Sequence, residues 1–156
     1  MWQRIQSVYL LFIAAFGVLA IILPVASLVN VDSNMIYAVD FRGISLIPAT
    51  GEAILQNSTS LLLALPAVFA IIALVVLFSF KNRVKQIRLA VINFIFMISY
   101  YVVYAYYVWS ACSALNAEFH VKIGAIFPLL AMIFNYLAIG AIGKDEKLVK
   151  SLDRLR

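Results

Sequence analysis

The sequence has very few residues that could carry redox or metal chemistry, with one cysteine and one histidine among 156 residues. A disulfide or a C-x-x-C redox pair needs two thiols, so the lone Cys112 excludes both within one chain. His120 cannot supply two axial haem ligands, and as a metal ligand it would find only Glu118 nearby. No serine is placed to form a nucleophilic pair with this histidine. We therefore expect no cofactor, no metal site and no enzyme activity.

Charge is the second scarcity, and it is missing altogether from four long apolar runs. Charged residues make up 12% of the chain and hydrophobic residues 65%, against about 25% and about 45–50% in soluble domains. Each run reaches the roughly 20 residues that cross a bilayer core of about 30 Å. The runs are Val8 to Val29, Thr59 to Phe80, Leu89 to Trp109 and Ile123 to Ile142. Proton-coupled transport generally uses an ionisable residue at mid-membrane, so this pattern disfavours a proton-coupled exporter.

The four runs predict a single integral membrane domain over residues 1–156. Each span must be helical, because a lone strand in lipid would leave its backbone amides unpaired. We expect an all-α fold, an antiparallel four-helix transmembrane bundle. In the long loop 30–57, the alternation of "IYAVDFRGISL" and its turn at Arg42 and Gly43 predict a short strand or hairpin. His120 is expected in a short loop, and Ser58 or Thr59 is expected to cap the second helix.

The basic residues are distributed unevenly between the connecting segments. Of the twelve Lys and Arg residues, only Arg42 and Lys122 fall on the side of the long loop. By the positive-inside rule, both termini and the "KNRVKQIR" segment of this multi-pass protein are cytoplasmic. The net charge of +5 is therefore explained by the orientation of the protein in the membrane, and we expect no nucleic-acid partner. The candidate cytoplasmic contacts to lipid or to a partner are Lys81, Arg83, Lys85, Arg88, Lys147, Lys150 and Arg154.

The first apolar run has a second interpretation as a signal peptide, because Arg4 precedes it and small residues follow. Removal of a signal peptide would leave three spans, which the charge pattern would also permit. The run from Val8 to Val29 has 22 residues, whereas the apolar region of a signal peptide has about 7–15. We therefore favour a retained helix.

Polar side chains inside the spans are few and form two groups. Asn93 and Asn135 are amides in hydrocarbon, where they need a partner from another helix. Tyr100, Tyr104 and Tyr107 are spaced by four and three residues, so their rings share one helix face. Both groups are candidates for contacts between helices. The alternative for the asparagines is contact with a substrate, and for the tyrosines it is a bound lipid headgroup or a quinone-like ring.

Eight of the last fourteen residues, "GKDEKLVKSLDRLR", carry charge. Asp145 would interrupt an apolar face if the fourth span simply continued as one straight helix. The sequence therefore predicts a break near Gly143, followed by a separate amphipathic helix over the cytoplasmic tail 144–156. The acidic residues of that helix could meet the basic residues of "KNRVKQIR".

The two ends of the sequence carry a recognisable pattern. The start "MWQRIQSVYLLF" and the finish "KDEKLVKSLDRLR" resemble those of an uncharacterised four-helix integral membrane family of Bacteroidetes-type bacteria. Its members open M-x-Q-R-I-Q and close K-D-E-x-L-V-x-S-x-D-R-[LI]-R. The resemblance implies an inner-membrane protein with four spans. It implies no reaction, ligand or partner, because the family is a domain of unknown function.

Two hypotheses for function follow from these residues. The first is a non-enzymatic structural or partner-binding membrane component, surrounded by membrane lipids and packed against another membrane protein or a second copy of the chain. The alternative is a small permease, or a protein that binds a lipid or a quinone, through the tyrosines and the two asparagines. A cavity between the helices would favour the alternative.

Overall fold

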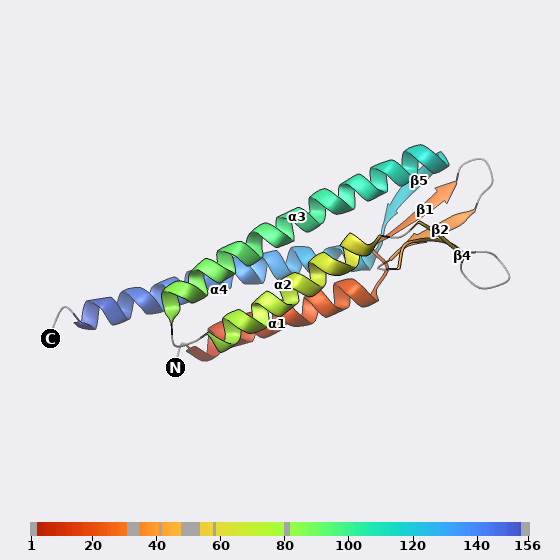
Figure 1. Cartoon of the computed structure of the whole chain (residues 1–156). Coiled ribbons are helices and arrows are strands. Elements are labelled where there is room, and N and C mark those ends of the chain that lie inside the picture. The colour runs from red at the N-terminus through yellow and green to blue at the C-terminus, as the bar shows by residue number, and fades with distance from the viewer. Residues whose placement is uncertain are drawn as a thin grey trace.

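A computed structural model describes residues 3–30, 35–40, 42–47, 54–57, 59–79 and 82–153 of the chain (Figure 1). Four long helices pack side by side, and a small antiparallel sheet covers one end of them. The helices are α1 (Gln3–Ile22), α2 (Ser60–Phe78), α3 (Arg83–Leu115) and α4 (Ile126–Asp153). The strands are β1 (Ala26–Asn30), β2 (Ile36–Val39), β3 (Ile44–Ile47), β4 (Ile54–Asn57) and β5 (Ala117–Val121), and a short 3-10 helix, η1 (Ile123–Ala125), precedes α4.

Each helix packs against two others, in the order α1, α2, α3, α4 and back to α1. Both ends of the chain lie at one end of the helices, which we call the terminal end. The sheet lies at the opposite end, the sheet end (Figure 1). All four helices are long and apolar enough to cross a membrane, so the prediction of four long apolar helices is confirmed.

The helices are held by an apolar core that all four supply. Its fully buried members include Leu10 of α1, Phe69 of α2, Met97 of α3 and Ala131 of α4. The α1–α2 contact is closest at Gly17, where an added Cβ would lie 2.7 Å from the Cβ of Ala70. A larger residue there would separate the two helices.

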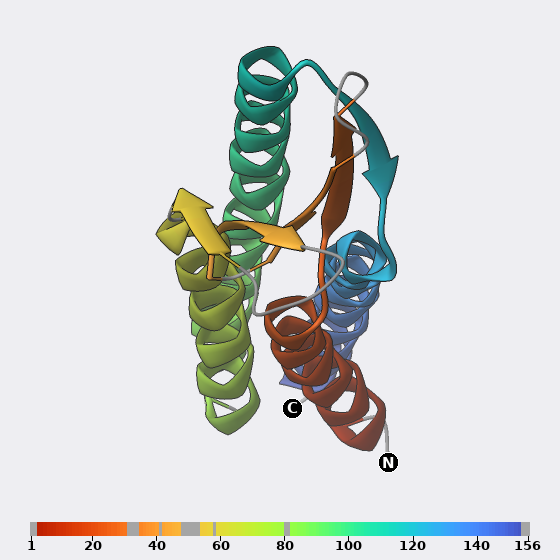
Figure 2. The same cartoon turned by 90° about the vertical axis from the view of Figure 1, so that its right-hand side faces the viewer.

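The sheet corrects the prediction of an all-α fold. The expected hairpin in the long loop is present as β2 and β3, and it belongs to a five-stranded sheet of order β4-β3-β2-β1-β5. Strand β5 adds the segment around His120, which was wrongly expected to be a loop. It pairs antiparallel with β1, placing Leu28 opposite Phe119 and Ser27 opposite His120. Seen from the sheet end, β5 is the outermost strand beside β1 (Figure 2).

The first apolar run was wrongly read as one helix from Val8 to Val29. α1 ends at Ile22 and β1 begins at Ala26. Pro24 has no N–H and disfavours helical geometry in the residue before it, so the chain leaves the helix there. The carbonyl of Pro24 then accepts a hydrogen bond from the N–H of Gly124 (3.1 Å). An added Cβ on Gly124 would lie 2.5 Å from that oxygen, so glycine permits the approach.

The fourth helix corrects the prediction of a break near Gly143. α4 continues through Gly143 to Asp153 without interruption, and no separate amphipathic helix forms over the described part of the tail. Asp145 does turn towards the other helices, as a straight helix requires. Polar partners make this burial of the Asp145 carboxylate stable, so α4 can continue as a straight helix.

The helices differ in length, and the two longest, α3 and α4, extend beyond their neighbours at opposite ends of the molecule. At 1.5 Å per residue, the 33 residues of α3 span about 50 Å and the 19 of α2 about 28 Å. α3 continues past α2 at the sheet end, and α4 continues past the other helices at the terminal end (Figure 1). The predicted third run, Leu89 to Trp109, therefore covers only the middle of α3.

Candidate functional site

A line of polar residues runs along the buried face of α3. Gln86, Asn93 and Tyr100 are each buried and are separated by seven residues, close to two helical turns. Gln86 donates from Nε2 to the carbonyl of Val76 on α2 (3.1 Å). The helix thus presents an amide, a second amide and a phenol to the interior, one above the other.

The two asparagines differ in how they are satisfied. Asn135 of α4 donates from Nδ2 to the carbonyl of Ala90 on α3 (2.9 Å), which joins the two helices directly. Asn93 lies one turn beyond Ala90 and is fully buried. Both polar atoms of the Asn93 side chain, and Oδ1 of Asn135, have no hydrogen-bond partner in the structure. An unpartnered buried polar group costs about 1–3 kcal/mol, so these atoms are costly unless a small polar molecule binds them.

The tyrosines predicted to form one stripe face the interior at the sheet end. The rings of Tyr100 and Tyr104 are stacked, with centroids 6.2 Å apart and planes 7° apart. The Tyr104 hydroxyl donates to the carbonyl of Val25 (3.1 Å), whereas the hydroxyl of Tyr100 has no partner. Tyr107 is half-buried and packs on the edge of the same cluster.

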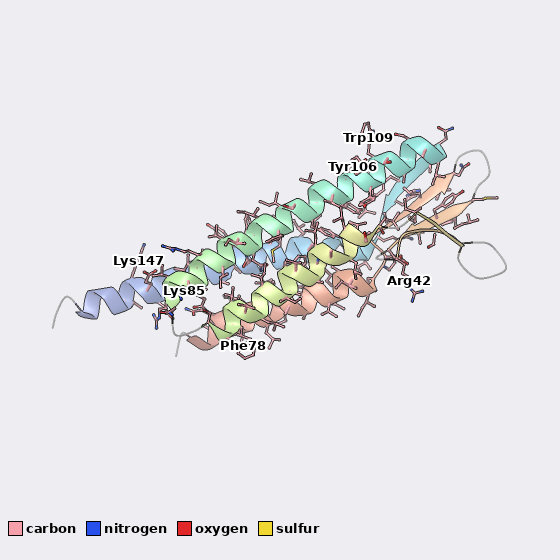
Figure 3. The ribbon with its side chains drawn as sticks, in the orientation of Figure 1. Arg42, Phe78, Lys85, Tyr106, Trp109 and Lys147 are labelled. Atoms are coloured by element: carbon pink, nitrogen blue, oxygen red, sulfur yellow. The ribbon has the colours of Figure 1, made fainter. Side chains whose placement is uncertain are left out.

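Three further aromatic side chains lie on α3. Tyr101, which the sequence analysis did not single out, donates its hydroxyl to the carbonyl of Ala125 (2.8 Å). Tyr106 and Trp109 instead project away from the other helices and are 63% and 72% exposed (Figure 3). The aromatic segment of α3 therefore has an inner face whose hydroxyls bind backbone carbonyls and an outer face that is largely exposed.

The terminal end holds a polar cluster that joins both ends of the sequence. Gln6 of α1 donates from Nε2 to Oδ2 of Asp145 on α4 (2.7 Å), and both side chains are buried. Arg83 of α3 lies with Nη1 4.0 Å from the same carboxylate oxygen. The predicted meeting of tail acids with the basic segment is thus confirmed for Arg83 and Asp145. Gln6 was missed as a site residue, although it belongs to the opening motif.

The remaining basic candidates lie on the surface at the terminal end. Lys85 and Lys147 are exposed there, while Arg42 lies at the sheet end (Figure 3). Arg88 is also exposed. Lys81, Arg154 and the side chain of Lys150 lie outside the described residues.

The sheet end is organised by hydrogen bonds to the backbone. Thr59 precedes α2, but its hydroxyl makes no helix cap and donates instead to the carbonyl of Asp40 (2.8 Å). The expectation that Thr59 caps α2 is therefore wrong, and Ser58 lies outside the described residues. Among those residues, no three His, Cys, Asp or Glu side chains gather where they could hold a metal ion.

Strand β5 is the described edge of the sheet next to α3. The N–H of Lys122 donates to the carbonyl of Val25 (3.2 Å), so these two residues form a hydrogen-bonded pair between the antiparallel strands. Hydrogen-bonded pairs recur at every second residue, so the residues of β1 two and four positions after Val25 also form hydrogen bonds with β5. The backbone groups of the alternate residues then point away from β1. These residues are Ala117, Phe119 and Val121.

Comparison with known proteins gives a family and no reaction. None of the curated proteins matches the chain. A family described as a domain of unknown function, DUF4293, matches residues 2–155. That match includes Gln6, Arg83 and Asp145, which form the cluster at the terminal end. The chain therefore belongs to the DUF4293 family.

Proposed function

We propose that the protein is a non-enzymatic, partner-binding component of the bacterial inner membrane. Its four helices would form a transmembrane bundle with both termini in the cytoplasm and the sheet on the outer side. Ten of its twelve basic residues then lie on the cytoplasmic side, as the positive-inside rule requires. The packing of Leu10 and Ile13 of α1 in the core supports retention of the first span. Membrane lipids surround it, and nucleic acid has no role.

The observation that carries partner binding is the open edge of β5. All its residues from Glu118 to Val121 are exposed, and the backbone groups of its alternate residues point away from β1. An unpaired strand edge is a template for an extended segment of another chain. Binding by strand addition derives affinity from main-chain hydrogen bonds and uses alternate side chains for specificity. A partner protein with an extended segment outside the membrane fits this edge.

Site-specific photo-crosslinking in native membranes tests this proposal. A photoreactive residue at Glu118 should form an adduct with another protein, whereas one at Val102, which is 66% exposed on α3, should not. Val121→Pro removes an N–H that points away from β1, so it should leave the fold intact and abolish the adduct. Val121→Ala keeps that N–H and should preserve the adduct. Equal adducts at Glu118 and Val102, or insensitivity to proline, would contradict the proposal.

A second candidate function rests on the unpartnered buried atoms of Asn93, Asn135 and Tyr100. In a permease, these groups would bind water or a small neutral solute on its way between the helices. Proteoliposomes that contain the protein should then respond faster to an osmotic gradient of water, urea or glycerol than empty vesicles. Asn93→Leu should remove this difference while the purified protein keeps its melting temperature. If vesicles with and without the protein responded at equal rates, the permease function would be contradicted and these side chains would serve only helix packing.

A further inference from the structure

The exterior of the helical part has a groove between α1 and α4 near the terminal end. Its volume is about 610 Å³, within the roughly 300–1,000 Å³ of sites for small ligands. Ile5 and Tyr9 of α1 form one wall, and Tyr136, Leu137, Gly140 and Lys144 of α4 are among the residues of the other. Along α4 it extends eight residues, which is about 12 Å.

Glycine keeps the middle of this groove open. A Cβ added to Gly140 would meet no atom within 4 Å, so helix packing does not require glycine at this position. The neighbouring walls are apolar and partly exposed, with Ile5 at 44% and Leu137 at 43%. A flexible hydrocarbon chain could therefore lie along α4 at Gly140 without moving the protein.

Charge defines one end of the groove. Lys144 lies two residues after the last apolar run, at the level where a spanning helix leaves hydrocarbon and enters the headgroup layer. Its neighbour Asp145 is turned inward and bound by Gln6 and Arg83, so its carboxylate is not available to pair with Lys144. Tyr136 lies at the opposite end of the groove, about 12 Å away along α4, so Lys144 is the charged group at the headgroup level.

We propose that this groove binds an anionic phospholipid, with its phosphate at Lys144 and an acyl chain along Gly140 between α1 and α4. The site rests on the proposed membrane location, but not on partner binding through β5. One lysine beside an anionic headgroup distinguishes it from a zwitterionic one by about five-fold in affinity. The groove itself supplies the binding common to both lipids.

Native mass spectrometry of the full-length protein tests the site, with phosphatidylglycerol and phosphatidylcholine of identical acyl chains as probes. The wild type should prefer phosphatidylglycerol by about five-fold. Lys144→Gln should remove this preference, whereas Lys147→Gln, which changes a cation outside the groove, should retain it. Gly140→Leu should reduce binding of both lipids at least several-fold. Gly143→Leu is its matched control, because Gly143 also has open space but does not line the groove.

Three results would overturn the proposal. One is equal binding of the two lipids by the wild type, and another is equal loss of selectivity in Lys144→Gln and Lys147→Gln. The third is a dimer that dissociates in Gly140→Leu without any lipid selectivity, because the groove would then bind a second copy of the chain. Fractionation of the cells that express these variants tests separately whether the protein lies in the membrane. A membrane-bound protein without lipid selectivity would thus contradict only the lipid site.

Discussion

The terminal end and the sheet end bury polar groups in different ways. At the terminal end, side chains from sequence positions 139 residues apart satisfy one another, as Gln6 does with Asp145. At the sheet end, the hydroxyls of Tyr101 and Tyr104 donate to backbone carbonyls of Ala125 and Val25, where the chain enters or leaves a strand. One end therefore depends on the identity of paired side chains, and the other on where the backbone turns.

The largest expected effect is at the terminal end. Among the described side chains, Gln6→Leu would leave the buried carboxylate of Asp145 with the guanidinium of Arg83, 4.0 Å away. We expect the free energy of unfolding to fall by about 1.5–3 kcal/mol, the loss typical of a hydrogen bond to a charged group. Chemical denaturation of the purified protein measures it. The double variant Gln6→Leu with Asp145→Leu should recover part of this loss, and additive losses would contradict the pairing.

The next effect is at the sheet end, where the backbone of Gly124 approaches Pro24. Gly124→Ala places a Cβ 2.5 Å from the Pro24 carbonyl oxygen, and overpacking of this kind costs about 1–3 kcal/mol. Gly143→Ala is the control, since that position is open. It should leave stability unchanged or raise it by up to about 1 kcal/mol, because alanine favours a helix interior. Equal melting temperatures for the two variants would show that the approach is not tight.

A pair of conservative tyrosine variants tests the hydrogen bonds at the sheet end. Tyr104→Phe removes the donor to Val25 and should cost about 1 kcal/mol in thermal or chemical unfolding. Tyr100→Phe removes a hydroxyl that has no partner, so it should be neutral or slightly stabilising. A loss in Tyr100→Phe equal to that in Tyr104→Phe would mean that a water or solute binds the Tyr100 hydroxyl.

The smallest effect on stability is expected in the middle of the helices, between the terminal end and the sheet end. Asn135→Leu loses one hydrogen bond between α4 and α3 and should cost about 0.6 kcal/mol, the average for such bonds in membrane proteins. Asn93→Leu loses no bond seen in the structure and should cost less. Unfolding in mixed detergent micelles can resolve the difference. A larger cost for Asn93→Leu would indicate an occupied polar site beside it.

Sequence reasoning succeeded where the constraint was local and strong. Uncharged apolar runs of about 20 residues predict helices, and all four are present. The alternation around Tyr37 and the turn at Gly43 predicted β2 and β3, because strand periodicity and turn chemistry are read from neighbouring residues. It failed at Pro24, where the run of apolar residues masked the change from helix to strand. It also failed at β5, where Ala117, Phe119 and Val121 do alternate with polar residues, because a run of five residues is short and its pairing with β1 cannot be read from neighbouring residues.

The candidate site was predicted in its residue types but not in its partners. Asn93, Asn135 and the three tyrosines were singled out because polar groups are unusual in apolar runs. Which of these side chains has a hydrogen-bond partner depends on the segment packed against it. The sequence of one helix does not show which segment that is. Asp145 is the sharpest example, since it was expected to break α4 and instead pairs across the structure.

By itself, the sequence determined four long apolar helices, the concentration of basic residues on one side of them and the scarcity of reactive side chains. These properties depend only on the length, hydropathy and charge of consecutive residues. Tertiary structure alone decided that α4 runs unbroken through Gly143, that β5 completes the sheet, and that Gln6 meets Asp145. The physical reason is that a buried polar or unpaired backbone group is stable only when another segment supplies its partner.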